Sequence, residues 1–299
     1  MTAVGVLGMG RMGAAMARAI AAAGYELVLW NRTNEPAAAL ARELDCRAVS
    51  RPADVAAVAD VCVTMLADGH AVDAAFRGPD GLLAGARPGN VLVDSSTVPP
   101  TIIRSFEAYA RGNGAGLLDA PVSGSVALAR SGKLTIMVGG TAADLERARP
   151  VLDALAGTVF HMGPLGSGAA MKLAANALIF GLNEAVAEGL VLAEAAGIDR
   201  QLAYDVLTAS AAGAPYIGYK RAAFLEPADT PIAFSLDLAA KDLRLITELA
   251  ADSGVPMPQT ATNLDVIVAA SAGGHGDRDF SSVAEHLRES ARAEEGRPA

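Results

Sequence analysis

The stretch 2-TAVGVLGMGRMGAAMARAIAAAG-24 combines a short apolar strand, a glycine cluster and an alanine-rich helix. Gly8, Gly10 and Gly13 have the spacing GxGxxG between the strand and the helix. The first glycine permits a tight turn, the second lets a pyrophosphate approach the backbone, and the third lets the helix pack closely on the strand. The phosphates would then lie at the positive end of the helix. An ordinary glycine-rich turn is the alternative. The predicted dinucleotide-binding residues are Gly8, Met9, Gly10, Arg11, Met12 and Gly13.

The residues after the second expected strand, 26-ELVLW-30, bear on the choice of cofactor. An acidic residue there would accept hydrogen bonds from the adenine ribose hydroxyls and favour NAD. This chain has Asn31, Arg32 and Thr33 instead. A guanidinium and a hydroxyl suit a 2′-phosphate through charge-assisted hydrogen bonds, so we predict NADP, with NADPH preferred over NADH. A solvent-facing arginine in a loop is the alternative.

Apolar strand-like runs recur along the N-terminal half, with helical spacers between them. They are 60–66, 90–96, 116–121, 133–140 and 157–163. This alternation predicts an α/β domain over residues 1–163, a doubly wound Rossmann-type sheet that is mostly parallel and covered on both faces. Ligands of such sheets bind beyond the carboxyl ends of the strands. The expected lining is therefore residues 67–69, 95–97 and 123–125.

After Met162 the strand pattern stops, and the remainder reads as helices separated by Gly and Pro. They are expected at 166–196, 199–211, 214–225, 234–253, 258–272 and 281–292. We therefore predict an all-α substrate and dimerisation domain over residues 164–299, beginning with a long interdomain helix. A helix of about 30 residues is about 45 Å long. It is expected to pack against both domains or against a second subunit, in a homodimer or homotetramer.

Length and charge restrict the class of protein. The 299 residues suit two domains, and a net charge of −9 gives no general attraction to nucleic acid or anionic lipid. No apolar run free of Gly, Asn and charge reaches the length of about 20 residues that spans a bilayer, and no signal-peptide pattern is present. We expect a soluble, cytoplasmic protein with no membrane or nucleic-acid partner.

The cysteines and histidines show no pattern typical of metal ligands. Cys46 and Cys62 lie in apolar, sheet-like surroundings and are expected to be buried, free thiols in a reducing compartment. The histidines are scattered along the chain, and none is assigned to a metal or to a Ser-His-Asp group. They are His70, His161, His275 and His286.

Five motifs, in order along nearly the whole chain, resemble the β-hydroxyacid dehydrogenase family, which includes 3-hydroxyisobutyrate dehydrogenase, tartronate semialdehyde reductase and the glyoxylate/succinic semialdehyde reductases. They are 5-GVLGMGRMGAAMA-17, 94-DSSTVPP-100, 119-DAPVSGS-125, 166-GSGAAMKLAAN-176 and 234-FSLDLAAKDLRL-245. The resemblance implies a 6-phosphogluconate dehydrogenase-like fold. It also implies interconversion of a short 3-hydroxy acid and its semialdehyde or oxo acid, for which Arg32 favours NADP as the cofactor. The chain departs from the family at Ser125, where a glycine is usual, and this bears on the identity of the substrate.

Lys172 and Asn176 lie one turn apart on the expected long helix, so both can reach one substrate. As an ammonium, Lys172 could polarise a carbonyl and supply the proton that an alkoxide needs after hydride transfer. Asn176 could fix the substrate oxygen or the ammonium without adding charge. A lysine that reaches water beside a surface asparagine is the alternative. The resemblance favours a catalytic pair.

The resemblance also implies the remaining contacts. Ser123, Gly124 and Ser125 would bind a substrate carboxylate through hydroxyls and backbone N–H groups, although a plain turn would have the same sequence. Lys241 would approach both substrate and cofactor, and a surface lysine paired with a neighbouring helix is its alternative. The other cofactor contacts implied are Leu66, Ala67, Thr97 and Phe234.

Two other functions stay open at this point. An imine reductase-like enzyme could use the same scaffold, but such enzymes usually carry another residue where this chain has Lys172. A non-catalytic NADP-binding protein would need neither Lys172 nor Asn176. Tyr216, Tyr219 and Lys220 could line the pocket or pack a helix, and they stay unassigned.

Overall fold

The computed structural model describes residues 2–295, which form two compact units. Unit 1 ends at Lys172 and unit 2 begins at Leu173, so the limit between them falls inside helix α9 (Ser167–Ala195). The first residues of α9 belong to unit 1 because they bond to the sheet: the Ala169 N–H donates to the Asp119 carboxylate. The boundary predicted after residue 163 is the position where the last strand ends.

Unit 1 is built on a nine-stranded sheet in the order β3-β2-β1-β4-β5-β6-β8-β7, with β9 paired to β8. The first six strands of this order are parallel, which confirms the predicted doubly wound sheet. Strand β8 runs antiparallel to β6 and β7, a reversal that the apolar pattern did not indicate. The strands are β1 (Ala3–Leu7), β2 (Glu26–Trp30), β3 (Arg47–Ala48), β4 (Val61–Thr64), β5 (Val91–Asp94), β6 (Gly116–Asp119), β7 (Val122–Ser123), β8 (Leu134–Gly139) and β9 (Ala156–Gly163).

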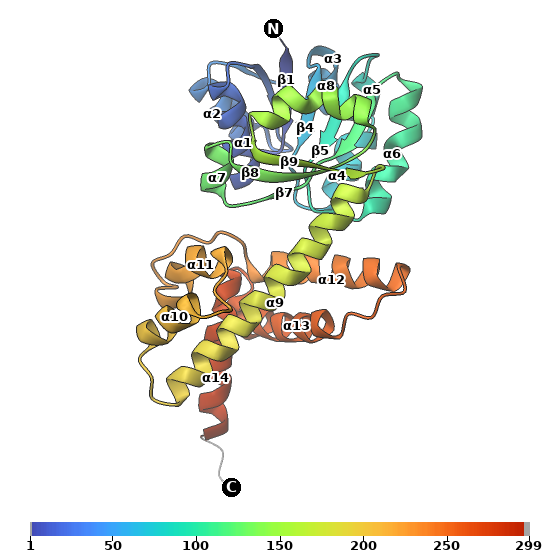
Figure 1. The fold of residues 1–299 in the computed structure, drawn as a ribbon. Coiled ribbons are helices and arrows are strands. Elements are labelled where there is room, and N and C mark those ends of the chain that lie inside the picture. Colours follow the sequence, from blue (N-terminus) through green and yellow to red (C-terminus); the bar gives the residue numbers. More distant parts are fainter. Residues whose placement is uncertain (1, 296–299) are drawn as a thin grey trace. The chain divides into compact units, whose positions relative to one another are not determined.

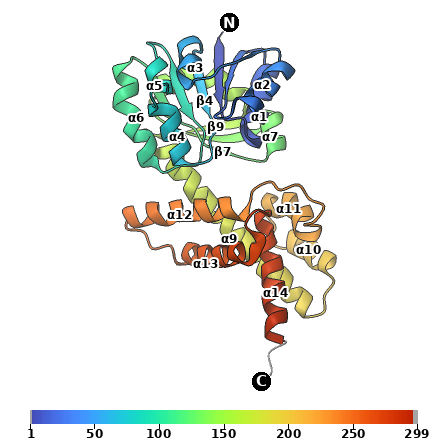
Figure 2. The ribbon, with the colours of Figure 1, turned by 180° about the vertical axis from the view of Figure 1, so that it is seen from behind.

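Helices cover both faces of this sheet (Figures 1 and 2). Alternation along β4 shows why: Val61 and Val63 enter one apolar cluster, whereas Cys62 between them enters another on the opposite face. A strand that is apolar on both sides needs a helix on both sides. The helices are α1 (Arg11–Ala22), α2 (Asn34–Glu43), α3 (Pro52–Val58), α4 (Gly69–Arg77), α5 (Leu82–Gly85), α6 (Pro100–Gly112), α7 (Val126–Arg130) and α8 (Ala142–Asp153).

Unit 2 is helical, as predicted, and in its described residues the only strand-like pairing is an isolated bridge between Ser235 and Asp279. Each predicted helix is present with ends shifted by a few residues. Its core is aromatic at the centre, where the rings of Phe180, Phe234 and Phe280 contact one another. Besides α9, the helices are α10 (Arg200–Ala209), α11 (Pro215–Leu225), α12 (Leu236–Asp252), α13 (Pro258–Ala270) and α14 (Val283–Glu295), with the short turns η1 (Ser271–His275) and η2 (Phe280–Ser282).

Two further sequence-based expectations can be compared with the structure. Helix α9 is long and apolar enough, by length and composition, to cross a membrane, although the stricter criterion applied to the sequence excluded it. Core helices of soluble proteins pass the same test, so this finding is weak evidence for a membrane span.

Cys46 and Cys62 are both free thiols: Cys62 is buried, as expected, whereas Cys46 is only half-buried.

Candidate active site

The glycine loop between β1 and α1 has the geometry that each glycine was predicted to supply. Gly8 has φ +99°, and a Cβ at Gly13 would lie 1.9 Å from the Gly8 carbonyl oxygen. At Gly10, in contrast, no described heavy atom comes within 4 Å of the position that a Cβ would take. Helix α1 begins at Arg11 without a side-chain cap, so its first N–H groups can meet an anion. The loop therefore fits a dinucleotide pyrophosphate.

Asn31, at the end of β2, ties the glycine loop to the neighbouring strand. Its Oδ1 accepts a hydrogen bond from the Met9 N–H at 2.9 Å, and its Nδ2 donates to the Thr33 carbonyl and hydroxyl oxygens at 2.9 and 3.1 Å. Arg32 and Thr33 are exposed beside it. Asn31 thus has a structural role in the loop, beyond the cofactor contact predicted from the sequence.

The ends of β4 and β5 are joined through the buried carboxylate of Asp94. Its Oδ1 accepts hydrogen bonds from the Thr64 and Ser96 hydroxyls at 2.5 and 2.7 Å. The Ser96 hydroxyl in turn accepts from the Leu66 N–H at 2.9 Å. Burial raises the pKa of Asp94 to about 6. These hydrogen bonds fix the chain where β4 and β5 end. The predicted cofactor residues Leu66, Ala67 and Thr97 follow directly after those strand ends.

The Ser123–Ser125 segment is a turn that leads into α7. Ser123 is half-buried and Gly124 is exposed with φ +141°, a backbone conformation that suits glycine. Ser125 is the N-cap of α7, and its Oγ accepts from the Leu128 N–H at 3.3 Å. Ser125, which stands where the family usually has a glycine, therefore caps a helix, a role that the sequence did not suggest.

Asp119 fixes the start of the predicted catalytic helix. Its Oδ1 accepts from the Gly166 N–H and its Oδ2 from the Ala169 N–H, both at 2.7 Å. A Cβ at Gly168 would lie 2.2 Å from the Met137 carbonyl oxygen, so only glycine fits between the helix and the sheet. The glycines of 166-GSG-168 and the carboxylate of Asp119 together set the position of the helical turn that carries Lys172. Asp119 lay in a quoted motif, but no role was predicted for it.

Asn176 is buried, with 6% of its surface exposed, which argues against a surface asparagine. Its Nδ2 donates to Asp242 Oδ2 at 2.8 Å. The Lys241 Nζ lies 2.7 Å from the other carboxylate oxygen, so Asp242 links an amide on α9 with an ammonium on α12. Lys172, one turn before Asn176, is half-buried. Asp242 lay in a quoted motif, but no role was predicted for it.

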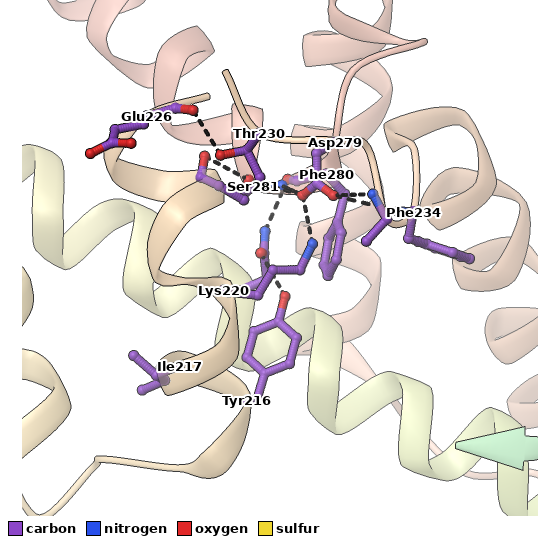
Figure 3. Close-up of polar contacts among 12 residues, drawn as sticks. Tyr216, Ile217, Lys220, Glu226, Thr230, Phe234, Asp279, Phe280 and Ser281 are labelled. Carbon is purple, nitrogen blue, oxygen red and sulfur yellow. Dashed lines mark hydrogen bonds and ion pairs between the residues drawn. The ribbon is translucent and has the colours of Figure 1, made fainter. Parts of the chain in front are cut away.

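A second carboxylate, Asp279, holds the segment before α12 (Figure 3). Its Oδ2 accepts from the Ala233 and Phe234 N–H groups at 3.0 and 3.4 Å, and the Lys220 Nζ lies 2.6 Å from its Oδ1. Lys220 is 2% exposed and lies 4.4 Å from the centre of the Phe280 ring. Burial acts to lower the pKa of Lys220, and Asp279 opposes this. Lys220 is therefore a buried partner of Asp279 in the core of unit 2.

Comparison with known proteins identifies relatives over almost the entire chain. Residues 3–163 match the NAD binding domain of 6-phosphogluconate dehydrogenase, and residues 166–287 match the NAD-binding region of NADP-dependent 3-hydroxyisobutyrate dehydrogenase. A protein of Mycobacterium tuberculosis named "Probable 3-hydroxyisobutyrate dehydrogenase" is 38% identical over 296 residues, covering 96% of this chain and 98% of the relative.

Two further relatives extend the comparison. The NAD-dependent L-serine dehydrogenase of Pseudomonas aeruginosa is 35% identical, with 95% of this chain and 97% of the relative covered. The crystal structure of 3-hydroxyisobutyrate dehydrogenase from Salmonella typhimurium superposes with a TM-score of 0.87 at 29% identity, covering 95% of this chain and 99% of that one. The chain belongs to the β-hydroxyacid dehydrogenase family. It is an NAD(P)-dependent hydroxyacid dehydrogenase with the fold predicted from its motifs.

Proposed function

We propose that this protein is an NADP-preferring reductase of a short 3-oxo or semialdehyde acid, with Lys172 as general acid and base. The observation that carries the proposal is the anchoring of Asn176. Asp242 holds this buried amide one helical turn from Lys172, in the segment that matches the catalytic segment of the family. A protein that only bound the cofactor would need no buried amide at this place.

A bound nicotinamide cofactor would supply the hydride, and residues of the chain would donate or accept the proton. Lys172 as an ammonium donates a hydrogen bond to the substrate carbonyl oxygen and transfers its proton as negative charge develops there. In the direction of oxidation, neutral Lys172 accepts the proton of the alcohol. Asp242 fixes the amide of Asn176 through one Nδ2 hydrogen. The second Nδ2 hydrogen can then be donated to the substrate oxygen, and the Oδ1 can accept from the Lys172 ammonium.

The substrate carboxylate is assigned to Ser123, Gly124, Ser125 and Lys241. The Ser125 Oγ already accepts from the Leu128 N–H, so its own proton can be donated to a carboxylate oxygen. Lys241 supplies a positive charge, and its pairing with Asp242 limits the positions that its Nζ can take. These groups suit a small acid with one carboxylate, such as a short 3-oxo or semialdehyde acid.

NADP preference is assigned to Arg32, which is exposed at the end of β2 where the adenine ribose of a dinucleotide lies in this fold. A 2′-phosphate would accept charge-assisted hydrogen bonds from its guanidinium and from the Thr33 hydroxyl. The further cofactor contacts are assigned to Asn31, Leu66, Ala67, Thr97, Phe234 and Lys241, in addition to the glycine loop.

A homodimer or homotetramer in the cytoplasm is part of the same proposal. Leu178 and Leu192 on α9 are 67% and 72% exposed, and Leu202 and Val206 on α10 are 55% and 60% exposed. Leu202 and Val206 are four residues apart and therefore share one face of α10. Neighbouring large apolar side chains that stay exposed are typical of subunit interfaces. Light scattering after size exclusion tests the mass, and a monomer for both wild type and Leu178→Arg would contradict the assembly.

The experiment that tests the activity follows NADPH absorbance with glyoxylate and with succinic, tartronic and methylmalonic semialdehydes. Lys172→Ala is compared with wild type, and Lys133→Ala, an exposed lysine, serves as the control. We expect one acid to be reduced rapidly and kcat to fall by about 10²–10⁴-fold in Lys172→Ala alone, because general acid catalysis contributes about that much. Equal activity of Lys172→Ala would remove the lysine from the mechanism. A wild-type enzyme that reduces a cyclic imine and no acid would replace the proposal with an imine reductase.

A further inference from the structure

The turn η1 and helix α14 bring together two histidines and a glutamate that are distant in the sequence. His275 ends η1, and His286 and Glu289 lie three residues apart on one face of α14. One nitrogen or oxygen atom of each lies within 4.8 Å of the others. The histidines are scattered along the sequence, but the fold brings these two close together, a proximity that spacing along the chain does not show.

Two glycines lie where the turn approaches α14. Gly274 has φ +94°, which turns the chain between α13 and His275. A Cβ at Gly273 would lie 3.4 Å from the His286 Nδ1, so Gly273 packs beside that ring. The two imidazole rings have their centres 6.2 Å apart at 68°. The turn thus presents His275 to α14 rather than to solvent.

His275 is the fixed member of this group. It is 3% exposed, and its Nε2 lies 3.0 Å from the Glu289 Oε2. Its Nδ1 is also buried and has no hydrogen-bond partner among the described residues. A buried imidazole nitrogen without a partner is unusual, because most buried polar atoms are paired. An ion pair with Glu289 involves the His275 Nε2 alone, and it gives no role to the neighbouring imidazole of His286.

Two imidazoles and one carboxylate form a donor set that suits a divalent transition metal. His2Glu with a fourth position for water is a known coordination of Zn²⁺, and imidazole also suits Co²⁺ and Ni²⁺. Mg²⁺ and Ca²⁺ prefer oxygen donors, of which this group offers only the carboxylate of Glu289. The exposed Glu289 and half-buried His286 could adjust to an ion while His275 remains in place.

We propose that His275, His286 and Glu289 bind a divalent transition-metal ion of the Zn²⁺ class, which clips η1 to α14. The clip would be transmitted to α12 through the backbone that follows His275. The Gly276 and Arg278 carbonyls accept hydrogen bonds from the Asp237 and Leu236 N–H groups at 3.0 Å, at the first turn of α12. The ion would therefore stabilise unit 2 and the start of the helix that carries Lys241, without taking part in hydride transfer.

The test uses the full chain, treated with a chelator and then titrated calorimetrically with ZnCl2. We expect one ion per chain, an increase in the temperature of unfolding, and absorption bands of a nitrogen- and oxygen-ligated ion when Co²⁺ replaces Zn²⁺. His286→Ala and Glu289→Gln change only side chains that are not fully buried, so both variants should fold. Each should weaken Zn²⁺ binding by about ten-fold or more, the lower range for disturbing a metal site.

His70→Ala is the matched control, since His70 is exposed on α4 in unit 1. This variant should retain wild-type affinity for Zn²⁺ and the same Co²⁺ spectrum. The proposal is overturned if wild type binds no stoichiometric Zn²⁺, or if His286→Ala and Glu289→Gln bind it as tightly as wild type does. The measurement does not depend on catalysis, so the outcome is separate from that of the proposed activity.

Discussion

The Asn176 amide donates to one oxygen of the Asp242 carboxylate, at 2.8 Å, while the Lys241 ammonium lies 2.7 Å from the other oxygen. Asp242 is 1% exposed, so its charge must be compensated by these neighbours rather than by water. One buried carboxylate thus sets the position of two groups that we assign to substrate binding and catalysis, and it links helix α9 with helix α12.

Replacing Asp242 with Asn should weaken the link between Asn176 and Lys241. The amide keeps the size of the carboxylate but removes the charge that holds Lys241, and it places an N–H donor where an acceptor is needed. We expect kcat/KM to fall by about 10–100-fold, because a hydrogen bond to a charged group is worth about 1.5–3 kcal/mol. Steady-state kinetics should be compared with Asp252→Asn, an exposed carboxylate near the end of the same helix. Unchanged kinetics in a folded Asp242→Asn enzyme would show that Asp242 serves packing alone.

Asp119→Asn should destabilise the start of α9. The carboxylate accepts two backbone N–H groups with two oxygens, whereas an asparagine amide has a single acceptor oxygen and turns an NH2 group toward the other donor. We expect a loss of about 1–3 kcal/mol in the free energy of unfolding and faster hydrogen exchange at Gly166 and Ala169.

Asp68→Asn is the control for Asp119, because Asp68 caps α4 through a single hydrogen bond to the Ala71 N–H at 2.8 Å. Asparagine is as good an N-cap as aspartate, so this exchange should change stability only slightly. Equal stability losses in the two variants would mean that the carboxylate of Asp119 has no special relation to α9.

Arg32→Ala should reduce the preference for NADPH over NADH. We expect the ratio of the two kcat/KM values to fall by about 10–100-fold, since one charge-assisted contact to a 2′-phosphate is lost and the NADH value depends little on it. Arg42→Ala, an exposed arginine on α2, is the control. If Arg32→Ala leaves the ratio unchanged, the guanidinium faces solvent and the preference must be explained by other residues.

Glu184 should make the stability of the protein depend on pH. Both of its carboxylate oxygens are buried without a hydrogen-bond partner in the described structure, and burial raises its pKa to about 8, with a smaller effect of Glu188. A pKa raised on folding stabilises the native state at low pH. This contribution is complete below the unfolded value of 4.5 and is lost as the pH rises through about 8.

Glu184→Gln should remove this dependence, because glutamine does not titrate. At pH 5 the melting temperatures of variant and wild type should be similar, whereas at pH 9 the variant should be more stable, by an amount on the order of a few kcal/mol. Glu146→Gln, an exposed residue of α8, should follow wild type at both pH values. A difference between Glu184→Gln and wild type that is the same at pH 5 and pH 9 would contradict the assignment.

The sequence predicted those features that depend on neighbours along the chain. Gly8, Gly10 and Gly13 act through the turn in which they lie, and the long helix 166–196 follows from apolar composition and a closing glycine. The antiparallel course of β8 could not be predicted, because apolar alternation is the same in both directions. Neither could Asp242 and Asp119 be recognised, since their partners, Asn176 and Gly166, are brought to them only by the fold.

Cys62, at the centre of β4, has a buried thiol whose chemical modification can report on opening of the sheet. Burial raises the pKa of its thiol to about 12, so at pH 8 only about one molecule in ten thousand carries the nucleophilic thiolate. Cys46, which is half-buried, should react with a maleimide much sooner. The delay between the two modifications would measure how rarely the central strands of the sheet open. A bound dinucleotide that stabilises the glycine loop beside β4 should lengthen that delay.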